Sequence, residues 1–316
     1  MHYKVYNLIA AIDDLLPGLI PTDRAEADVQ VSNTSSETFY VPSQPFMEWH
    51  LPGRELWLSF FKLDDGYLLR FEKLADFLIR NSGKEIVCLP RPEIPSNTIH
   101  HLLLNQVIPL VINLKGSEAL HASAVLTPNG VVAFAGPAGS GKSTLAGSLI
   151  NMGYSLVSDD CLVLAGKGDG IYGIPAYPGL RLWDDSLSCL FGDNDAHKPV
   201  AHYTNKWRVD IKKMLETYCT KSQPLKRLYH IVASTEIDGK TDIIIEQLSL
   251  QDSFMALVTS AFRLDITDRE MLKRQFRFLE RVTSTVSVRR LIYPRNFRLL
   301  PAVREAILKD LQDLEN

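Results

Sequence analysis

Residues 131–150 join an apolar run, a glycine-rich loop and a helical segment, and this order constrains the fold more than any other stretch. Val131-Val-Ala-Phe-Ala135 is short and wholly apolar, as a strand at the centre of a sheet is. It leads into Gly136-Pro-Ala-Gly-Ser-Gly-Lys-Ser143, and Thr144-Leu-Ala-Gly-Ser-Leu-Ile150 follows with helical periodicity. Strand, glycine loop and helix in this order are the context of a Walker A motif. The sequence therefore predicts an α/β fold with a P-loop that holds nucleotide phosphates.

The residues of this loop have distinct predicted roles. Its glycines let backbone N–H groups turn inward around the β-phosphate, at the N-terminus of the helix. Lys142 is expected to reach the β- and γ-phosphates, and Ser143 to place its hydroxyl on Mg²⁺. The alternative is a chance glycine-rich turn, and the flanking strand and helix argue against it. The predicted nucleotide contacts in the loop are Gly136, Pro137, Ala138, Gly139, Ser140, Gly141, Lys142, Ser143 and Thr144.

Two adjacent carboxylates end the next apolar run. Tyr154-Ser-Leu-Val-Ser158 reads as a strand, and Asp159 and Asp160 follow it within one helix and one strand of Lys142. Because Mg²⁺ is a hard cation that prefers oxygen ligands, this is a Walker-B-like arrangement. Two carboxylates also suggest divided work, one near the metal and one near an incoming hydroxyl. The alternative is a solvated turn at the strand end.

A histidine precedes the P-loop strand. Leu120–Thr127 reads as a strand, and Pro128-Asn129-Gly130 as a tight hairpin. Counting back across an Asn-Gly turn pairs Thr127 with Val132 and Val125 with Phe134, and sets His121 beside Ala138. A histidine there can contact the γ-phosphate or orient an acidic group, and a purely structural histidine remains the alternative.

Two further cations are candidate phosphate contacts. Arg181 stands in the apolar stretch Ile171–Trp183, where a phosphate clamp and a structural salt bridge are equally compatible with the pattern. Lys206 ends a predicted polar loop that begins at Ala196, and it is either a second phosphate contact or a solvated side chain. Asn205-Lys206-Trp207-Arg208 lacks the final carboxylate of a guanine-reading NKxD motif, so ATP is the expected nucleotide.

The chain divides into three predicted parts: a β-rich domain over 1–95, a connecting helix within 96–118 and a catalytic domain over 119–316. The first part contains the runs 55–61, 67–71, 77–79 and 85–89, read as a meandering antiparallel sheet with an Asp-Gly hairpin. Ser96 is the predicted N-cap of a helix over 97–112, which Pro109 kinks. In the third part, strands are expected at Leu225–Ala233, Asp242–Leu248 and Val286–Ile292, and helices at Ser253–Phe262, Asp268–Val282 and Pro301–Leu314.

Bulk composition excludes several classes of protein. The hydrophobic content of 46% and charged content of 22% are those of a globular chain, and the net charge of −3 offers no basic footprint for nucleic acid or anionic membrane. No apolar run approaches the ~18 residues that span a bilayer, and acids interrupt the N-terminus where a signal peptide would be apolar. A cytoplasmic protein is expected, with reduced cysteines and no metal held by histidine or cysteine.

Leu120-His-Ala-Ser-Ala-Val125, the glycine loop and Leu156-Val-Ser-Asp-Asp160 together resemble the HPr serine kinase superfamily, which is related to the phosphoenolpyruvate carboxykinases. The resemblance is specific over 119–183, and the lasso-peptide precursor kinases are the nearest fit. It implies a P-loop kinase core of this type behind an N-terminal β-rich (α+β) domain. It also implies that Asp159 is the general base on the acceptor hydroxyl, while Asp160 organises Mg²⁺ or His121. HPr kinases carry a glutamate-containing signature after the acidic pair, whereas Pro175–Trp183 holds no acid, so one metal-side contact is unassigned.

The sequence thus predicts a kinase that uses ATP and Mg²⁺ to phosphorylate a serine hydroxyl on a peptide or small protein, such as a lasso-type precursor. Asp159, Asp160, His121 and Lys142 are the predicted catalytic residues, and Ser143 and Asp160 the predicted metal ligands. Two alternatives stay open: a small-molecule kinase on the same core, and a nucleotide-dependent ATPase or switch that transfers nothing. No nucleic-acid or membrane partner is expected, and a homo-oligomer is compatible with the sequence.

Overall fold

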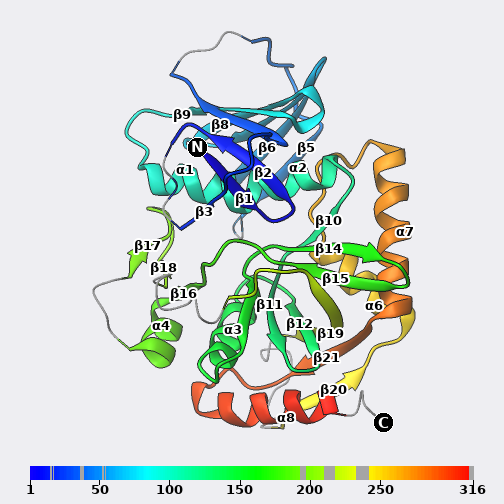
Figure 1. The fold of residues 1–316 in the computed structure, drawn as a ribbon. Coiled ribbons are helices and arrows are strands. Elements are labelled where there is room, and N and C mark those ends of the chain that lie inside the picture. The colour runs from blue at the N-terminus through cyan, green and yellow to red at the C-terminus, as the bar shows by residue number, and fades with distance from the viewer. Residues whose placement is uncertain are drawn as a thin grey trace.

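Two nine-stranded sheets, formed by the described residues, lie one above the other with helices between and below them (Figure 1). The computed structural model describes residues 1–14, 16, 18–35, 39–51, 53, 55–192, 197–209, 218–232 and 242–312. The first sheet is built from residues 2–90, and the second from strands between residues 118 and 292. The fold is mixed α/β.

The N-terminal sheet has the strand order β3-β1-β2-β4-β9-β8-β7-β6-β5. The predicted meander is confirmed from β5 to β9, where every neighbouring pair is antiparallel. The remainder is not a meander, because β4 pairs in parallel with both β2 and β9, so the sheet is mixed. The strands are β1 His2–Val5, β2 Leu8–Ile12, β3 Ile20–Pro21, β4 Val29–Asn33, β5 Met47–His50, β6 Leu56–Leu63, β7 Gly66–Phe71, β8 Ala75–Arg80 and β9 Glu85–Pro90.

The predicted Asp-Gly hairpin lies between β6 and β7. Leu63 pairs with Gly66, so Asp64 and Asp65 form the two-residue turn. A Cβ on Gly66 would stand 1.9 Å from the carbonyl oxygen of Ile79 on the next strand. Glycine is needed here because the β7–β8 backbones approach too closely for a side chain.

The connecting segment is helical but broken. It consists of α1 (Ser96–Leu102), a π-helical turn (Leu103–Val107) and α2 (Ile108–Leu114). A separate 3₁₀ turn, Asn81–Gly83, joins β8 to β9 in the N-terminal sheet. The predicted cap is wrong by one residue, since Pro95 is the N-cap and Ser96 the first helical residue. Pro109 lacks the N–H that an α-helix would direct at Asn105, and the π-helical turn ends just before it.

The second sheet has the order β10-β14-β15-β19-β12-β11-β13, and β21 joins β19 to β20 at its side. Its central strand β12 is buried along nearly its whole length, which is why its sequence is continuously apolar. Val132 and Phe134 face the core beneath α3 and α8, while Val131, Ala133 and Ala135 face α6 and α7. The strands are β10 Glu118–Leu120, β11 Ala122–Thr127, β12 Gly130–Ala135, β13 Ser155–Ser158, β14 Leu162–Lys167, β15 Gly170–Ile174, β19 Gln223–Val232, β20 Ile244–Gln247 and β21 Ser287–Ile292.

Helices cover both faces of this sheet. The predicted helices and strands after residue 220 are all found, although the predicted ends at Ala233 and Leu314 lie outside the described residues. The helices are α3 Lys142–Ile150, α4 Asp184–Phe191, α6 Leu250–Ser260, α7 Arg269–Thr285 and α8 Leu300–Gln312, with a 3₁₀ turn at Phe297–Leu299.

A small third sheet was not anticipated. It has the order β16-β18-β17, with β16 Arg181–Trp183, β17 Lys198–Pro199 and β18 Lys206–Arg208. Lys206 therefore begins a strand rather than ending a polar loop. Because β16 also carries Arg181, this sheet places both candidate cations on neighbouring strands.

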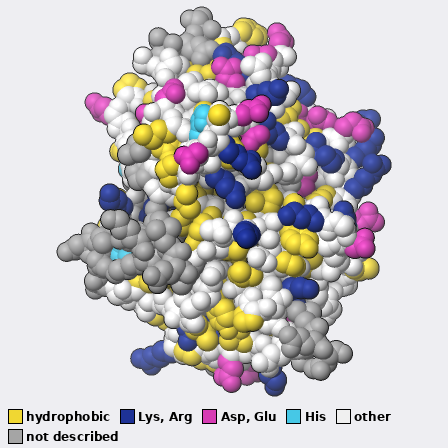
Figure 2. All heavy atoms as spheres, viewed as in Figure 1, with side chains coloured by type: hydrophobic (Ala, Val, Ile, Leu, Met, Phe, Trp, Pro, Cys, Tyr) yellow, Lys and Arg dark blue, Asp and Glu magenta, His cyan; other side chains and the backbone are white. Residues whose placement is uncertain are grey.

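No helix in the part of the chain that the structure describes is both long and apolar enough to cross a membrane. On the face shown in Figure 2, acidic and basic side chains are intermixed with apolar ones rather than gathered by sign.

Candidate active site

The sheet topology brings the predicted P-loop, residues 136–143, and the two carboxylates to one edge. β12 runs parallel to β19, and β11 is antiparallel to both β12 and β13, so β12 and β13 point the same way. The P-loop follows β12 and Asp159 follows β13, and both therefore leave the sheet at the carboxyl edge. β11 runs the other way, so its first residues, next to His121, stand at that same edge.

The predicted β11–β12 register is wrong by two residues. Thr127 pairs with Gly130 and Val125 with Val132, so Pro128 and Asn129 form the turn instead of Asn129 and Gly130. Proline suits the first central position of a turn because its φ is already set. His121 is consequently not paired opposite Ala138. It lies at the break between β10 and β11, and from there it lines the same cavity as Ala138.

The P-loop encloses one side of a cavity of about 430 Å³. Ala138–Thr144 line the cavity, while Gly136 and Pro137 contribute carbonyls to Lys142, whose Nζ lies 2.9 and 3.0 Å from them. A Cβ on Gly136 (φ +143°) would stand 2.7 Å from the Ile231 carbonyl oxygen. The loop can pass this close to β19 only with glycine at that position.

Both carboxylate oxygens of Asp159 accept hydrogen bonds. Its Oδ1 accepts from the hydroxyls of Ser123 and Ser143, each at 2.7 Å, and its Oδ2 accepts from the backbone N–H of Arg181 at 2.8 Å. The side chain is buried and does not line the cavity. Asp159 thus fixes the P-loop serine and the start of β16.

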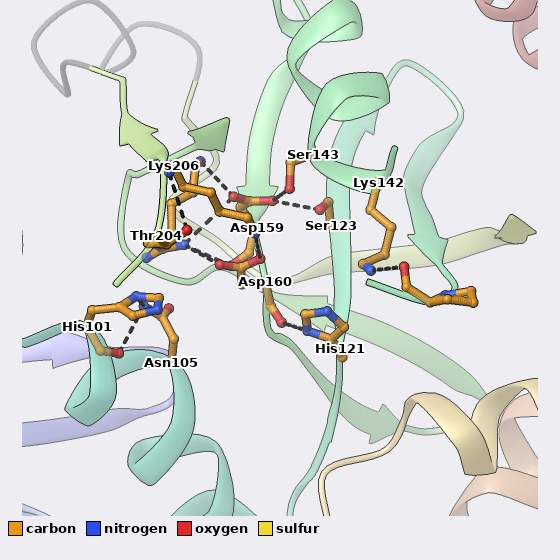
Figure 3. A network of polar contacts seen from close by, with 12 residues as sticks. His101, Asn105, His121, Ser123, Lys142, Ser143, Asp159, Asp160, Thr204 and Lys206 are labelled. Carbon is orange, nitrogen blue, oxygen red and sulfur yellow. Dashed lines mark hydrogen bonds and ion pairs between the residues drawn. The ribbon is translucent and has the colours of Figure 1, made fainter. Parts of the chain in front are cut away.

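Asp160 has the opposite setting, because its side chain lines the cavity and is surrounded by cations. Its backbone is left-handed at φ +65°, a conformation that aspartate tolerates better than most residues and that turns the chain sharply after β13. Its carboxylate lies 3.5 Å from Arg181 Nη1 and 3.8 Å from Lys206 Nζ. Its carbonyl accepts the Nδ1–H of His121 at 2.9 Å. Figure 3 shows the two carboxylates turned to different partners.

The electrostatics of the site follow from burial and these cations. Burial would raise the pKa of Asp160, but Lys206 and Arg181 hold it below its ordinary value. Burial and the neighbouring Asp160 raise the pKa of Asp159. Burial lowers the pKa of Lys142 to about 8 and that of His121 to about 4, so His121 is neutral at pH 7. With Nδ1 donating, its Nε2 is left as an acceptor.

A chain of hydrogen bonds connects this site to the connecting helix. Arg181 donates to the Tyr177 hydroxyl, Tyr177 donates to Asn105 Oδ1, and the Asn105 amide donates to His101 Nδ1 at 2.7 Å. Arg181 therefore forms buried ion pairs with both carboxylates, which is the salt-bridge alternative that the sequence left open. It also lines the cavity. Figure 3 shows His101 and Asn105 approaching from the connecting helix.

Sequence reasoning missed the far end of the cavity. Strand β21 is parallel to β19, so the residues after it emerge at the same edge as the P-loop. Arg295 donates to the Gly139 carbonyl, and Lys206 lies 5.6 Å from the ring of Trp183. The residues after β21 could have been predicted from the sequence, because polar residues that follow a parallel strand lie at the carboxyl edge of the sheet, where the P-loop also lies. The missed lining residues are Leu182, Trp183, Asp185, Ser186, Tyr293, Arg295, Asn296, Phe297 and Leu300.

The donors present fit a nucleotide and a hard divalent cation. Ser143, which Asp159 holds by a hydrogen bond, lines the cavity, and the cations Lys142, Arg181 and Lys206 line it as well. Among the described residues, no three His, Cys, Asp or Glu side chains cluster to hold an ion by themselves. Mg²⁺ does not require such a cluster, because it binds through one or two protein oxygens, phosphates and water.

Comparisons with known proteins identify no relative from which the function of this site could be taken. No family model matches the chain, and no curated protein matches it. Among solved structures, the HPr(Ser) kinase/phosphatase from Coxiella burnetii aligns with 63% of this chain and 99% of its own, at 14% identity and a TM-score of 0.35. A likeness at that level assigns neither a family nor an activity.

Proposed function

We propose that this protein is an ATP- and Mg²⁺-dependent kinase that transfers the γ-phosphoryl group to a serine hydroxyl of a peptide. The observation that carries the proposal is the division between the two aspartates. Asp159 is bound to the P-loop serine, whereas Asp160 faces a cavity lined by Lys142 and His121. The first arrangement holds the loop serine in place, and the second suits an incoming hydroxyl.

The loop N–H groups and Lys142 bind the phosphates. The N–H groups of Ala138–Thr144 surround the β-phosphate at the start of α3, where the helix dipole favours negative charge. Lys142 exchanges its carbonyl partners for phosphate oxygens, which keeps it protonated. Ser143, held by Asp159, would be the protein oxygen on Mg²⁺, and the cation supplies charge neutralisation on the transferred group when bound.

In the transfer step, the acceptor oxygen forms a bond to the γ-phosphorus as the bond to the β–γ bridging oxygen breaks. The bridging oxygen leaves with the electron pair on ADP, and the hydroxyl proton passes to Asp160. Asp160 is the better candidate for the base because it lines the cavity, while both oxygens of Asp159 accept other hydrogen bonds. This reverses the roles that the family resemblance implies. Orientation is the larger part of such a base's contribution in phosphoryl transfer.

The acceptor is proposed to be a peptide, with a lasso-type precursor as the finer hypothesis. The nucleotide cavity uses residues from His121 onward, and the nine strands of the N-terminal sheet contribute nothing to it. A sheet of that size with an exposed edge strand suits an extended chain better than a metabolite.

The test is incubation with γ-labelled ATP and Mg²⁺, offering serine-containing peptides, free serine and sugars, with mass spectrometry of the products. Transfer to peptides alone is expected. Phosphorylation of free serine or a sugar with peptides untouched would favour the small-molecule kinase, and release of phosphate alone would favour the ATPase or switch.

A further inference from the structure

A second cavity, of about 590 Å³, adjoins the nucleotide cavity. His121 lines both cavities and so stands at their junction. On one side this second cavity is bordered by β5, and on the other by the end of α6 and the residues that follow it. Its principal lining residues are Met47, Trp49, Gln106, His121, Phe262 and Arg263.

β5, the last strand of the N-terminal sheet, borders this cavity. Its consecutive residues Met47, Glu48 and Trp49 all line the cavity. β5 ends the N-terminal sheet and pairs with β6 alone among the described strands. An edge of this kind can hydrogen-bond an added strand.

The opposite wall is attached to the second sheet. The backbone N–H of His121 donates to the Ser260 carbonyl at 2.6 Å, and that of Phe262 to the Ala119 carbonyl at 2.9 Å. The rings of His121 and Phe262 lie 6.2 Å apart, edge to face. This wall therefore holds His121 in place at the point where the two cavities meet.

Arg263 supplies a cation without a partner in the described structure. It is partly exposed and makes no ion pair or hydrogen bond with the described residues, whereas Glu48 across the cavity lies 3.7 Å from His50. An arginine in a cavity that Trp49 and Phe262 also line suits a carboxylate carried on an apolar chain, since a guanidinium can bind a carboxylate through two parallel hydrogen bonds.

We infer that this cavity is the acceptor groove: an extended peptide lies along β5, with a carboxylate on Arg263 and its serine hydroxyl at His121 and Asp160. The inference rests on the proposed kinase function and specifies the substrate for it. The carboxylate belongs either to the peptide C-terminus or to an acidic side chain. His121 Nε2, an acceptor, receives the serine hydroxyl as it enters the nucleotide cavity.

The experiment measures binding and transfer separately on the full chain. The probes are labelled serine peptides in four forms: free or amidated at the C-terminus, each with aspartate or asparagine beside the serine. Binding is followed by fluorescence anisotropy with wild type, Arg263→Gln and the exposed control Arg269→Gln, and ATP affinity is measured for each. We expect Arg263→Gln to weaken binding of the carboxylate-bearing form about tenfold or more, and to leave the form lacking that carboxylate and the ATP affinity unchanged.

Backbone pairing is tested with peptides N-methylated at alternate residues, which should bind about tenfold more weakly than their unmethylated parents. Equal affinity of wild type and Arg263→Gln for every peptide would overturn the groove, even if peptides are phosphorylated. Self-association that responds to Arg263→Gln while peptides do not bind would assign the surface to a second copy and also overturn it. Peptide binding that depends on Arg263, without transfer to any acceptor, would support the groove and reject the kinase.

Discussion

At the scale of single residues, the two adjacent aspartates have different surroundings. The left-handed φ of +65° at Asp160 lets neighbouring carboxylates face different surroundings. Asp159 lies among hydroxyl and N–H donors, and Asp160 among cations. A local pattern cannot reveal this difference, because both residues look alike in the sequence.

Asp160→Asn is expected to lower the rate of transfer by roughly 10²–10⁴ while ATP affinity changes little, as for the loss of a general base. Asp159→Asn should instead raise the Mg²⁺ concentration needed for half-maximal rate and lower the melting temperature, because its buried donors lose a charged acceptor. Single-turnover rates across a Mg²⁺ titration distinguish the two, with exposed Asp169→Asn as the control. If Asp159→Asn loses transfer at saturating Mg²⁺ and Asp160→Asn does not, the roles are those of the family resemblance.

The P-loop lysine gives a pH dependence whose sign follows from its surroundings. The pKa of Lys142 is lowered to about 8, chiefly by burial, and bound phosphates would raise it. Lys142 then stays protonated in the ATP complex at pH values above 8, where it loses its proton in the free protein. Affinity should be constant below that pH and fall by up to about tenfold per unit above it. Calorimetry of ATP binding from pH 7 to pH 10 measures this, and Lys142→Met should bind weakly with no such slope. A wild-type affinity that is flat across this range would contradict the assignment.

At the scale of elements, the sequence predicted what is encoded locally. β12, the P-loop and α3 are contiguous, and an apolar strand, glycines and a helical period identify each one without distant contacts. The predicted β11–β12 register was wrong because the turn lies at Pro128 and Asn129, one residue earlier than predicted. The parallel pairing of β4 was not predicted, because such pairing depends on partners far along the chain. The small sheet of β16, β17 and β18 has strands of two or three residues, too short for any period to show.

Tyr177 joins the connecting helix to the site by hydrogen bonds with Asn105 and Arg181. Tyr177→Phe removes the hydroxyl between Arg181 and Asn105, both of which are buried. The Arg181 guanidinium then loses an acceptor, and Asn105 Oδ1 loses its donor. We expect a loss of about 1–3 kcal/mol in the free energy of unfolding and a transfer rate lowered by roughly tenfold. Denaturant unfolding and steady-state kinetics measure the two effects, and Tyr172→Phe on β15 is the matched control. A variant with wild-type rate and stability would show that the connection is without consequence.

At the scale of the whole molecule, the N-terminal sheet and the second sheet pack into one unit. The apolar core of the N-terminal sheet continues through the connecting helices to Val163, Phe262 and Met271, which belong to the second sheet and its surroundings. Removing residues 1–95 would expose this surface to water, so the function of the N-terminal sheet is best tested by point substitutions in the full chain.

Asp265 makes polar contacts between the N-terminal sheet and the residues that follow α6, and its charge gives a prediction for the stability of the whole molecule. Its buried carboxylate accepts from Lys62 Nζ at 2.8 Å and from the Tyr67 hydroxyl at 2.9 Å, both on the N-terminal sheet. Burial would raise the pKa of Asp265, but Lys62 and Thr267 lower it to about 2. A carboxyl group with a depressed folded-state pKa stabilises the protein above its unfolded pKa of ~3.9, and that contribution is lost as the pH falls towards 2.

Asp265→Asn is therefore expected to cost about 1–3 kcal/mol of unfolding free energy at pH 7, with the difference from wild type disappearing between about pH 4 and pH 2. Thermal and denaturant unfolding at several pH values measure this, with exposed Asp23→Asn as the control. Since Asp265 lies two residues beyond Arg263, loosening it also shifts one wall of the acceptor groove. The variant should raise the peptide KM while leaving ATP affinity unchanged. Equal losses in both affinities would instead mean that the junction supports the whole fold and not the groove in particular.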